Sequence, residues 1–174
     1  TIPAVGFVLN MERFSRLLAK ELFATCIEWE KWQDDVASEE DGYIVNRLKV
    51  AIPSAHPQID EPLVLRVHRD QLVTLEWFHV DASSAWFIEL TIPSDLEADP
   101  SISSPKSMDV IRGVVRSVVD FVEERLVAVY VLDASGSVVS WGGHRVVNDL
   151  KLPAHASAAI IRSWNGTYDR EVHA

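Results

Sequence analysis

The sequence predicts a single α+β domain over residues 1–174, in which a mainly antiparallel sheet is packed by an N-terminal helix and a long central helix. Three observations indicate this fold class. Apolar residues recur at helical spacing from Ser107 to Arg125, and the next segment, Leu126–Leu132, is apolar at every position. Short segments rich in β-forming residues, separated by turn residues, lie on both sides of this pair. The predicted order of elements is helix, four strands, helix, four strands.

The N-terminal helix is expected to begin at Asn10, which is a suitable N-cap, and to end before Gly42. Residues 1–9 are expected to form an edge strand or a tail. The helix has one apolar stripe, which continues to Trp32: Met11, Phe14, Leu17, Leu18, Leu22, Cys26 and Trp29. Cys26 is the only cysteine, and its place in this stripe favours a small buried hydrophobic side chain over a reactive thiol.

Four strands are predicted between the two helices: Tyr43–Ile52, Leu63–His68, Leu72–Val80 and Ala85–Ile92. If residues 69–71 and 82–83 form the loops of a meander, one face of the sheet becomes apolar throughout. This predicted core face consists of Leu63, Leu65, Val67, Val73, Leu75, Trp77, Ile88, Leu90 and Ile92. A shift of one residue would move a strand's whole apolar set to the other face, so the pattern supports both registers.

The opposite face of this meander is a candidate binding patch. The same registers place Glu76 opposite Glu89 and Phe78 opposite Phe87, with Arg66 diagonal to Glu76. Facing like charges cost stability unless they are compensated, and Arg66 is the candidate compensation. Two adjacent carboxylates could also act as an acid–base pair, although a solvated charged face is the simpler interpretation. The phenylalanines are either covered by the first helix or part of the binding surface.

The central helix has two candidate starts. Ser104 followed by Pro105 would place proline at the first helical position, and Ser107 followed by Asp109 is the later option. Because Leu126–Leu132 does not alternate with polar residues, it is expected in the middle of the sheet, covered on both faces.

The remaining strands are expected to join the same sheet. A turn at residues 133–136 leads to a returning strand over residues 137–141, which Gly142-Gly143 ends or distorts into a bulge. His144–Leu152 is predicted as a further strand. The last hairpin is predicted to turn at Asn165-Gly166, in a register that places Arg162 opposite Asp169.

The segment from Glu28 to Asp41 carries seven acidic residues and one basic residue. A solvated helix end and loop is the simplest interpretation. The alternative is an acidic surface for a basic partner, with Trp29 and Trp32 as anchors. The formal net charge of the chain is −10, which argues against nucleic acid as a partner and favours a basic protein surface.

Several classes of site lack their sequence signatures. No apolar run is long enough to span a bilayer, and the opening residues lack the features of a signal peptide, so a cytoplasmic location without membrane association is predicted. His79 and Asp81 share a strand face, but no further ligands converge on them by spacing. The nucleophile motif G-x-S-x-G does not occur. The sequence therefore indicates no catalytic residue, no metal and no cofactor.

Three runs resemble stretches of small uncharacterised bacterial α+β proteins, some of them suspected immunity proteins of polymorphic toxin systems. The runs are Trp77-Phe78-His79-Val80-Asp81, Glu124-Arg125-Leu126-Val127-Ala128-Val129 with Gly136 behind it, and Ser163-Trp164-Asn165-Gly166-Thr167. The resemblance implies a protein that binds another protein stoichiometrically, and it implies no catalytic residues.

Two classes of function stay open from the sequence. The first is a non-enzymatic acidic protein that blocks or holds a basic partner, in the manner of an immunity protein or a chaperone. The second is a small-ligand binder or hydrolase that uses the face of Arg66, Glu76 and Glu89. A homodimer, formed through an edge strand near the C-terminal hairpin, is also left open.

Overall fold

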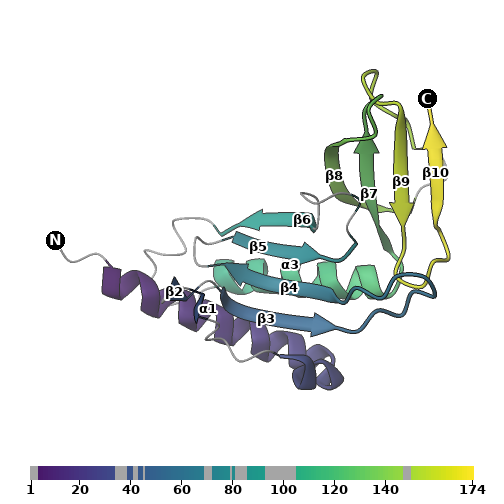
Figure 1. The fold of residues 1–174 in the computed structure, drawn as a ribbon. Helices are drawn as coiled ribbons and strands as arrows, with labels where there is room; N and C mark the ends of the chain where they lie inside the picture. The colour runs from purple at the N-terminus through teal and green to yellow at the C-terminus, as the bar shows by residue number, and fades with distance from the viewer. Residues whose placement is uncertain are drawn as a thin grey trace. The chain divides into compact units, whose positions relative to one another are not determined.

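The computed structural model describes residues 4–33, 39–40, 43–44, 46–68, 72–78, 80, 86–92, 105–146 and 150–174. It confirms an α+β fold with the predicted order of main elements (Figure 1). The chain divides into two compact units. The first comprises Thr1–Ile52, Val64–Thr74 and Glu89–Arg116, and the second comprises Pro53–Leu63, Leu75–Ile88 and Ser117–Ala174. Whether they form a single domain stays a prediction.

The first unit begins with α1 (Ala4–Thr25), which packs along β3 (Asn46–Ile52). Phe14, Leu18 and Leu22 are buried, as the apolar stripe predicts. The expected strand or tail at residues 1–9 is wrong over residues 4–9, because these belong to the helix. Once a helix exists, each added residue gains a hydrogen bond without a new nucleation cost, so the helix extends through the predicted cap, Asn10.

The helix also ends earlier than predicted, at Thr25, and a short 3₁₀ helix, η1 (Ile27–Trp32), follows it. Cys26 lies at this junction in an extended conformation and is half-buried. It is therefore outside the buried stripe in which the sequence placed it. Beyond the break, Trp29 is buried, whereas Ile27 and Trp32 are exposed.

A four-stranded sheet has the order β3-β4-β5-β6, where β4 is Leu63–His68, β5 is Leu72–Glu76 and β6 is Trp86–Thr91 (Figure 1). Burial alternates along β4, which confirms Leu63, Leu65 and Val67 as core residues. Leu90 was expected in the core, but 39% of its surface is exposed. It lies on an edge strand, which has a neighbour on one side only.

Other predictions for the region between the two long helices are either untested or only partly met. The predicted loops at residues 69–71 and 82–83 lie outside the described residues, so the two registers stay predictions, and so do the roles of His79 and Asp81. A separate ribbon pairs β1 (Glu39–Glu40) with β2 (Tyr43–Ile44), within the segment predicted to be a helix end, a loop and the start of a strand.

The central helix, α3 (Pro105–Val122), starts at the proline of the first predicted option. Its buried residues follow the helical spacing seen in the sequence: Ser107, Ile111, Val114, Val115, Val118 and Phe121. Arg112 and Arg116 are exposed on the opposite side of the helix. After α3 the chain reverses at Glu124, whose φ of 57° is left-handed.

The second unit contains an antiparallel sheet of order β10-β9-β7-β8, formed by β7 (Leu126–Leu132), β8 (Val138–Arg145), β9 (Ala158–Arg162) and β10 (Arg170–His173) (Figure 1). The interior position of β7 is confirmed. The expectation that these strands extend the first sheet is wrong, because they form a sheet of their own. The apolar pattern of a strand indicates how far the strand is buried, but it does not indicate which other strand will pair with it.

Two details of this sheet differ from the prediction and one agrees. The strand β8 continues through Gly142 and Gly143, which pair with Val129 and Ala128, so His144 and Arg145 belong to β8 and do not begin the separate strand predicted over His144–Leu152. A neighbouring strand supplies hydrogen bonds to glycine as well as to any other residue, and this outweighs the low strand propensity of the pair. The register of the C-terminal hairpin is confirmed, since Arg170 pairs with Ile161 and Glu171 with Ile160.

Candidate functional site

The residues of the predicted sheet patch lie on three consecutive strands. Arg66 is on β4, Glu76 ends β5, and Glu89 is on β6. Arg66 and Glu76 are half-buried, whereas Glu89 is exposed. The direct pairing of the two carboxylates stays a prediction, and the side chain of Phe87 lies outside the described ones. The patch therefore gains no defined geometry that would support acid–base chemistry.

Phe78 is held by side chains of the second unit. Its ring centroid lies 6.1 Å from that of Tyr130, and the Arg162 guanidinium lies 5.7 Å from the ring. The Tyr130 hydroxyl donates a hydrogen bond to the Phe78 carbonyl at 3.1 Å, and burial raises the pKa of this phenol. Phe78 was expected either to be covered by the first helix or to belong to a binding surface, and these partners from β7 and β9 were not predicted.

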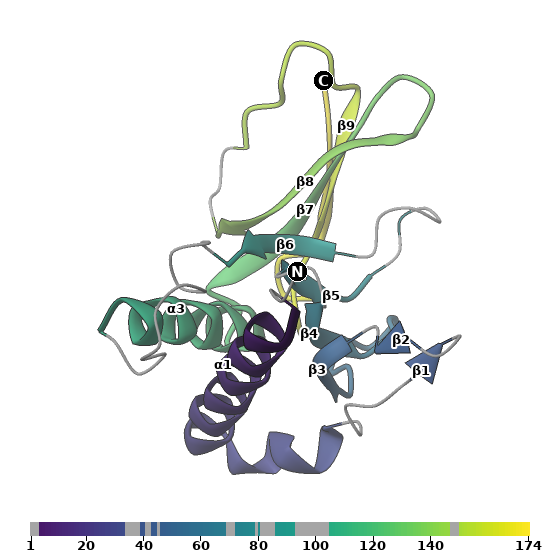
Figure 2. The same ribbon diagram turned by 90° about the vertical axis from the view of Figure 1, so that its left-hand side faces the viewer.

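The two tryptophans of the acidic segment both lie on the short helix η1, and they differ in how far they are exposed. Trp29 is buried, with 9% of its surface exposed, and η1 packs on α1 and β3. Trp32 is 39% exposed, and Ile27 is 73% exposed. The chain changes direction between α1 and η1 (Figure 2). Trp29 thus anchors the segment to the fold, while Trp32 and Ile27 face solvent.

The short helix η1 also carries charged side chains, and one of them lies beside Trp32. Lys31 Nζ lies 2.8 Å from Glu28 Oε2 and 5.3 Å from the centroid of the Trp32 ring. The hydrogen bond from Lys31 lowers the pKa of Glu28, so this carboxylate stays ionised. Glu30 is also exposed. Sequence reasoning singled out the two tryptophans of this segment and missed Ile27, which lies outside the predicted apolar stripe and is exposed.

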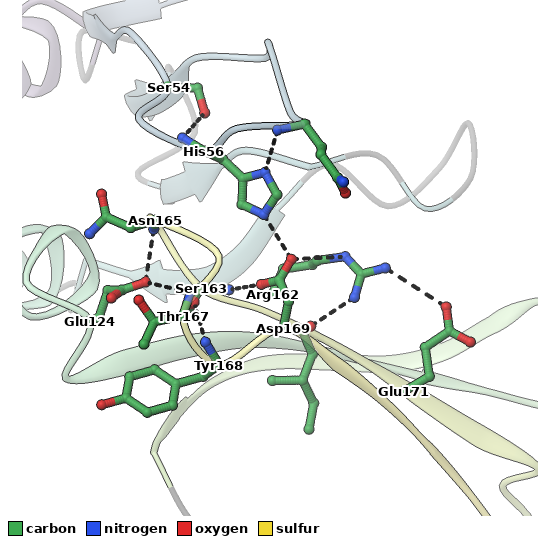
Figure 3. A network of polar contacts seen from close by, with 12 residues as sticks. Ser54, His56, Glu124, Arg162, Ser163, Asn165, Thr167, Tyr168, Asp169 and Glu171 are labelled. Carbon is green, nitrogen blue, oxygen red and sulfur yellow. Dashed lines mark hydrogen bonds and ion pairs between the residues drawn. The ribbon is translucent and has the colours of Figure 1, made fainter.

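A second cluster of polar side chains joins the loop after β3 to the C-terminal hairpin (Figure 3). His56 is buried, and its Nε2 lies 2.7 Å from Asp169 Oδ2. Its Nδ1 accepts a hydrogen bond from the Gln58 N–H at 3.0 Å, so Nε2 carries the proton and donates it to Asp169. Asp169 Oδ1 also accepts from the Ser163 N–H at 2.8 Å. Nε of Arg162 lies 3.7 Å from Oδ2 of Asp169, which confirms the predicted ion pair.

Glu124 binds the loop of the C-terminal hairpin from its other side (Figure 3). Glu124 Oε1 accepts hydrogen bonds from the backbone N–H groups of Asn165 at 2.8 Å and Thr167 at 3.3 Å. Burial alone would raise the pKa of Glu124. The hydroxyls of Thr167 and Ser163, together with these N–H groups, outweigh it and lower the pKa below its ordinary value of 4.5.

This cluster contains a serine, a histidine and an aspartate, but its hydrogen bonds serve to hold the loop after β3 against the C-terminal hairpin. We call His56, Asp169 and Ser163 together the clasp. Both ring nitrogens of His56 are engaged, one by Gln58 and one by Asp169. Ser163 Oγ accepts from the Tyr168 N–H at 2.9 Å. A histidine that activates a serine needs a ring nitrogen hydrogen-bonded to the hydroxyl, with the acid on the other nitrogen. Here Asp169 instead accepts a hydrogen bond from the backbone N–H of Ser163.

The three runs that carry the sequence resemblance meet beside this clasp. Trp77 and Trp164 lie 5.5 Å apart between ring centroids, and Phe121 lies 5.1 Å from Trp77 and 5.9 Å from Trp164. The rings of His56 and Trp77 are in a T-shaped arrangement, with 5.8 Å between their centroids. Glu124 joins the second run to the third. These residues therefore share one packed corner of the second unit, which sequence analysis did not foresee.

The hydrogen bonds to Glu124 make stability depend on pH. A carboxylate with a lowered folded pKa contributes stability above its unfolded pKa, and this is lost as pH falls through the folded pKa. We expect Glu124→Gln to lower the free energy of unfolding by about 1 kcal/mol at pH 7, because charge-assisted hydrogen bonds become neutral ones. Urea unfolding at pH 7, 5, 4 and 3 should show the difference shrinking below pH 4.5. A difference that is constant across this range would contradict the assignment, and the exposed neighbour Glu123→Gln is the control.

Comparisons with protein-family models, with curated proteins and with solved structures give no match for this chain. Within the described part of the chain, no helix combines the length and apolar character needed to cross a bilayer. In the same ranges, no three His, Cys, Asp or Glu side chains are grouped as metal ligands would be.

Proposed function

We propose that this is a non-enzymatic acidic protein that binds a basic protein partner, in the manner of an immunity protein or a chaperone, in the cytoplasm. The observation that carries the proposal is the surface of η1. There, two large apolar side chains, Ile27 and Trp32, are exposed on the same short helix as Glu28 and Glu30. The resemblance of three sequence runs to suspected immunity proteins points to the same class.

The energetics of such a surface favour a protein partner. Burial of exposed apolar area contributes about 25 cal/mol per Å², and tryptophan is enriched among residues that dominate interface energies. A rigid segment also loses less entropy on binding, and Trp29 fixes η1 to the fold. The carboxylates of Glu28 and Glu30, and the acidic sequence that follows, complement lysine and arginine on a partner.

The test begins with tagged protein and a lysate of the native host, followed by identification and purification of the captured partner. Calorimetric titration then gives the dissociation constant for wild type and variants. We expect Trp32→Ala to weaken binding about 30-fold, as for an interface residue worth about 2 kcal/mol. Ile27→Ser should also weaken it, and binding should weaken with rising salt.

Trp141 provides a matched control, because it is 40% exposed but lies in the second unit. Trp141→Ala should leave the dissociation constant unchanged. If Trp141→Ala or Glu89→Lys abolishes binding while Trp32→Ala does not, η1 is not the interface. If no captured protein binds directly after purification, the proposed function itself fails.

A further inference from the structure

The connection between β9 and β10 carries an exposed asparagine followed by a glycine, Asn165-Gly166. Figure 3 shows the side-chain amide of Asn165 directed away from the polar cluster. Gly166 has a φ of 80°, in the left-handed region that favours glycine. A Cβ added at Gly166 would lie 3.1 Å from Nε2 of His56, so a larger residue would push the imidazole away. The fold therefore requires a glycine directly after this exposed asparagine.

An asparagine followed by a glycine can lose its side-chain amide without an enzyme, which is one reason why asparagine is a thermolabile residue. The backbone nitrogen of the glycine loses its proton and attacks Cγ of the asparagine. A bond forms between this nitrogen and Cγ, the bond from Cγ to the amide nitrogen breaks, and ammonia leaves. Water then opens the cyclic imide at either carbonyl and gives aspartate or isoaspartate. Glycine favours the attack because it has no side chain to hinder its nitrogen.

The hydrogen bonds of the folded connection oppose the first step of this reaction. The N–H of Gly166 donates to the carbonyl of Ser163 at 3.0 Å, which retains the proton that must leave. On either side of it, the N–H groups of Asn165 and Thr167 donate to Oε1 of Glu124 at 2.8 Å and 3.3 Å. A carboxylate beside the glycine nitrogen also disfavours the negative charge that this nitrogen acquires on losing its proton. The reaction therefore needs the connection to open.

We propose that Asn165 is a site of spontaneous deamidation, and that the Glu124 carboxylate protects it in the folded protein. The reaction proceeds through local opening of the connection, in which the Gly166 N–H leaves the Ser163 carbonyl. Both products carry a new carboxylate at position 165, beside Glu124. Isoaspartate also adds one main-chain carbon between the two N–H groups that Glu124 binds. Deamidation is therefore an irreversible release of the connection from Glu124, and it does not depend on the η1 interface.

The test is incubation of the purified full chain in mildly alkaline buffer, followed by peptide mapping with mass spectrometry. A synthetic peptide of residues 162–169 should deamidate on the order of tenfold faster than the folded protein, because nothing holds it closed. Glu124→Gln should deamidate about fivefold faster than wild type, as expected when charge-assisted hydrogen bonds become neutral. Glu123→Gln, at the exposed neighbour, should react at the wild-type rate.

A second control separates local opening from general loss of stability. Ile52→Val truncates a buried side chain in β3 and should cost about as much stability as Glu124→Gln, without touching the connection. It should leave the rate of deamidation unchanged.

Three results would overturn the proposal: a peptide that reacts no faster than the folded protein, a Glu124→Gln rate equal to that of wild type, or the same acceleration in Ile52→Val as in Glu124→Gln. If Glu124→Gln does not fold, hydrogen exchange of wild type decides. The N–H groups of Asn165, Gly166 and Thr167 should then exchange on the order of tenfold more slowly than in the peptide, and equal rates would overturn the protection.

Discussion

Phe121→Ala is expected to lower the free energy of unfolding by about 3–5 kcal/mol, the range measured when a buried phenylalanine is truncated. The side chain is fully buried at the end of α3, and its ring contacts both Trp77 and Trp164. Truncation removes these aromatic contacts and leaves a cavity between two large rings that cannot close around it without moving backbone. Urea unfolding monitored by circular dichroism gives the loss.

Two variants check this interpretation. Phe121→Leu keeps much of the volume, so it should cost less than about 1.5 kcal/mol. Tyr168→Ala removes an aromatic ring that is 42% exposed, and it should change stability by no more than about 0.5 kcal/mol. A loss below about 1 kcal/mol in Phe121→Ala would mean that the corner between α3 and the hairpin is not tightly packed.

Asp169→Ala is expected to lower the free energy of unfolding by about 3 kcal/mol, because it leaves two buried donors without an acceptor. These donors are Nε2–H of His56 and the N–H of Ser163, and both residues are buried. Each buried donor left unpaired costs about 1–3 kcal/mol. The same unfolding experiment at pH 7 measures the loss.

A double-mutant cycle separates this clasp from simple loss of packing. His56→Phe removes the donor but keeps a ring, so the combined variant should lose about 1–2 kcal/mol less than the sum of the single losses. Glu171→Ala removes a carboxylate that is 55% exposed and lies 3.8 Å from Arg162, and it should cost no more than about 0.5 kcal/mol. Additive losses in the cycle would show that His56 and Asp169 do not act as a pair.

Much of the fold follows from short-range patterns in the chain. The spacing of Ile111, Val114 and Val118 predicted α3, including its start at Pro105. The uninterrupted apolar run Leu126–Leu132 predicted an interior strand. The register of the C-terminal hairpin was predicted correctly, although residues 163–169 connect its strands in place of the predicted two-residue turn at Asn165-Gly166. The Arg162–Asp169 pair followed from that register.

The candidate surfaces followed less well. The acidic segment and its tryptophans were visible in the composition, and the burial of Trp29 agrees with its place in the apolar stripe, but the helix break after Thr25 and the half-buried position of Cys26 were not predicted. The apolar stripe continues across the break, so periodicity alone gives no signal for it. The Glu76 and Glu89 patch depends on registers set by loops outside the described residues, and it stays a prediction.

The sequence by itself determined the type and order of the main elements, because backbone propensity, apolar period and turn chemistry act over a few residues. Only the tertiary structure decided that the last four strands form a separate sheet, and that His56 meets Asp169 across 113 residues of chain. Such pairings depend on the complementary shape and polarity of surfaces distant in sequence. No local pattern specifies those surfaces, so the contact of His56 with Asp169 became visible only in the folded chain.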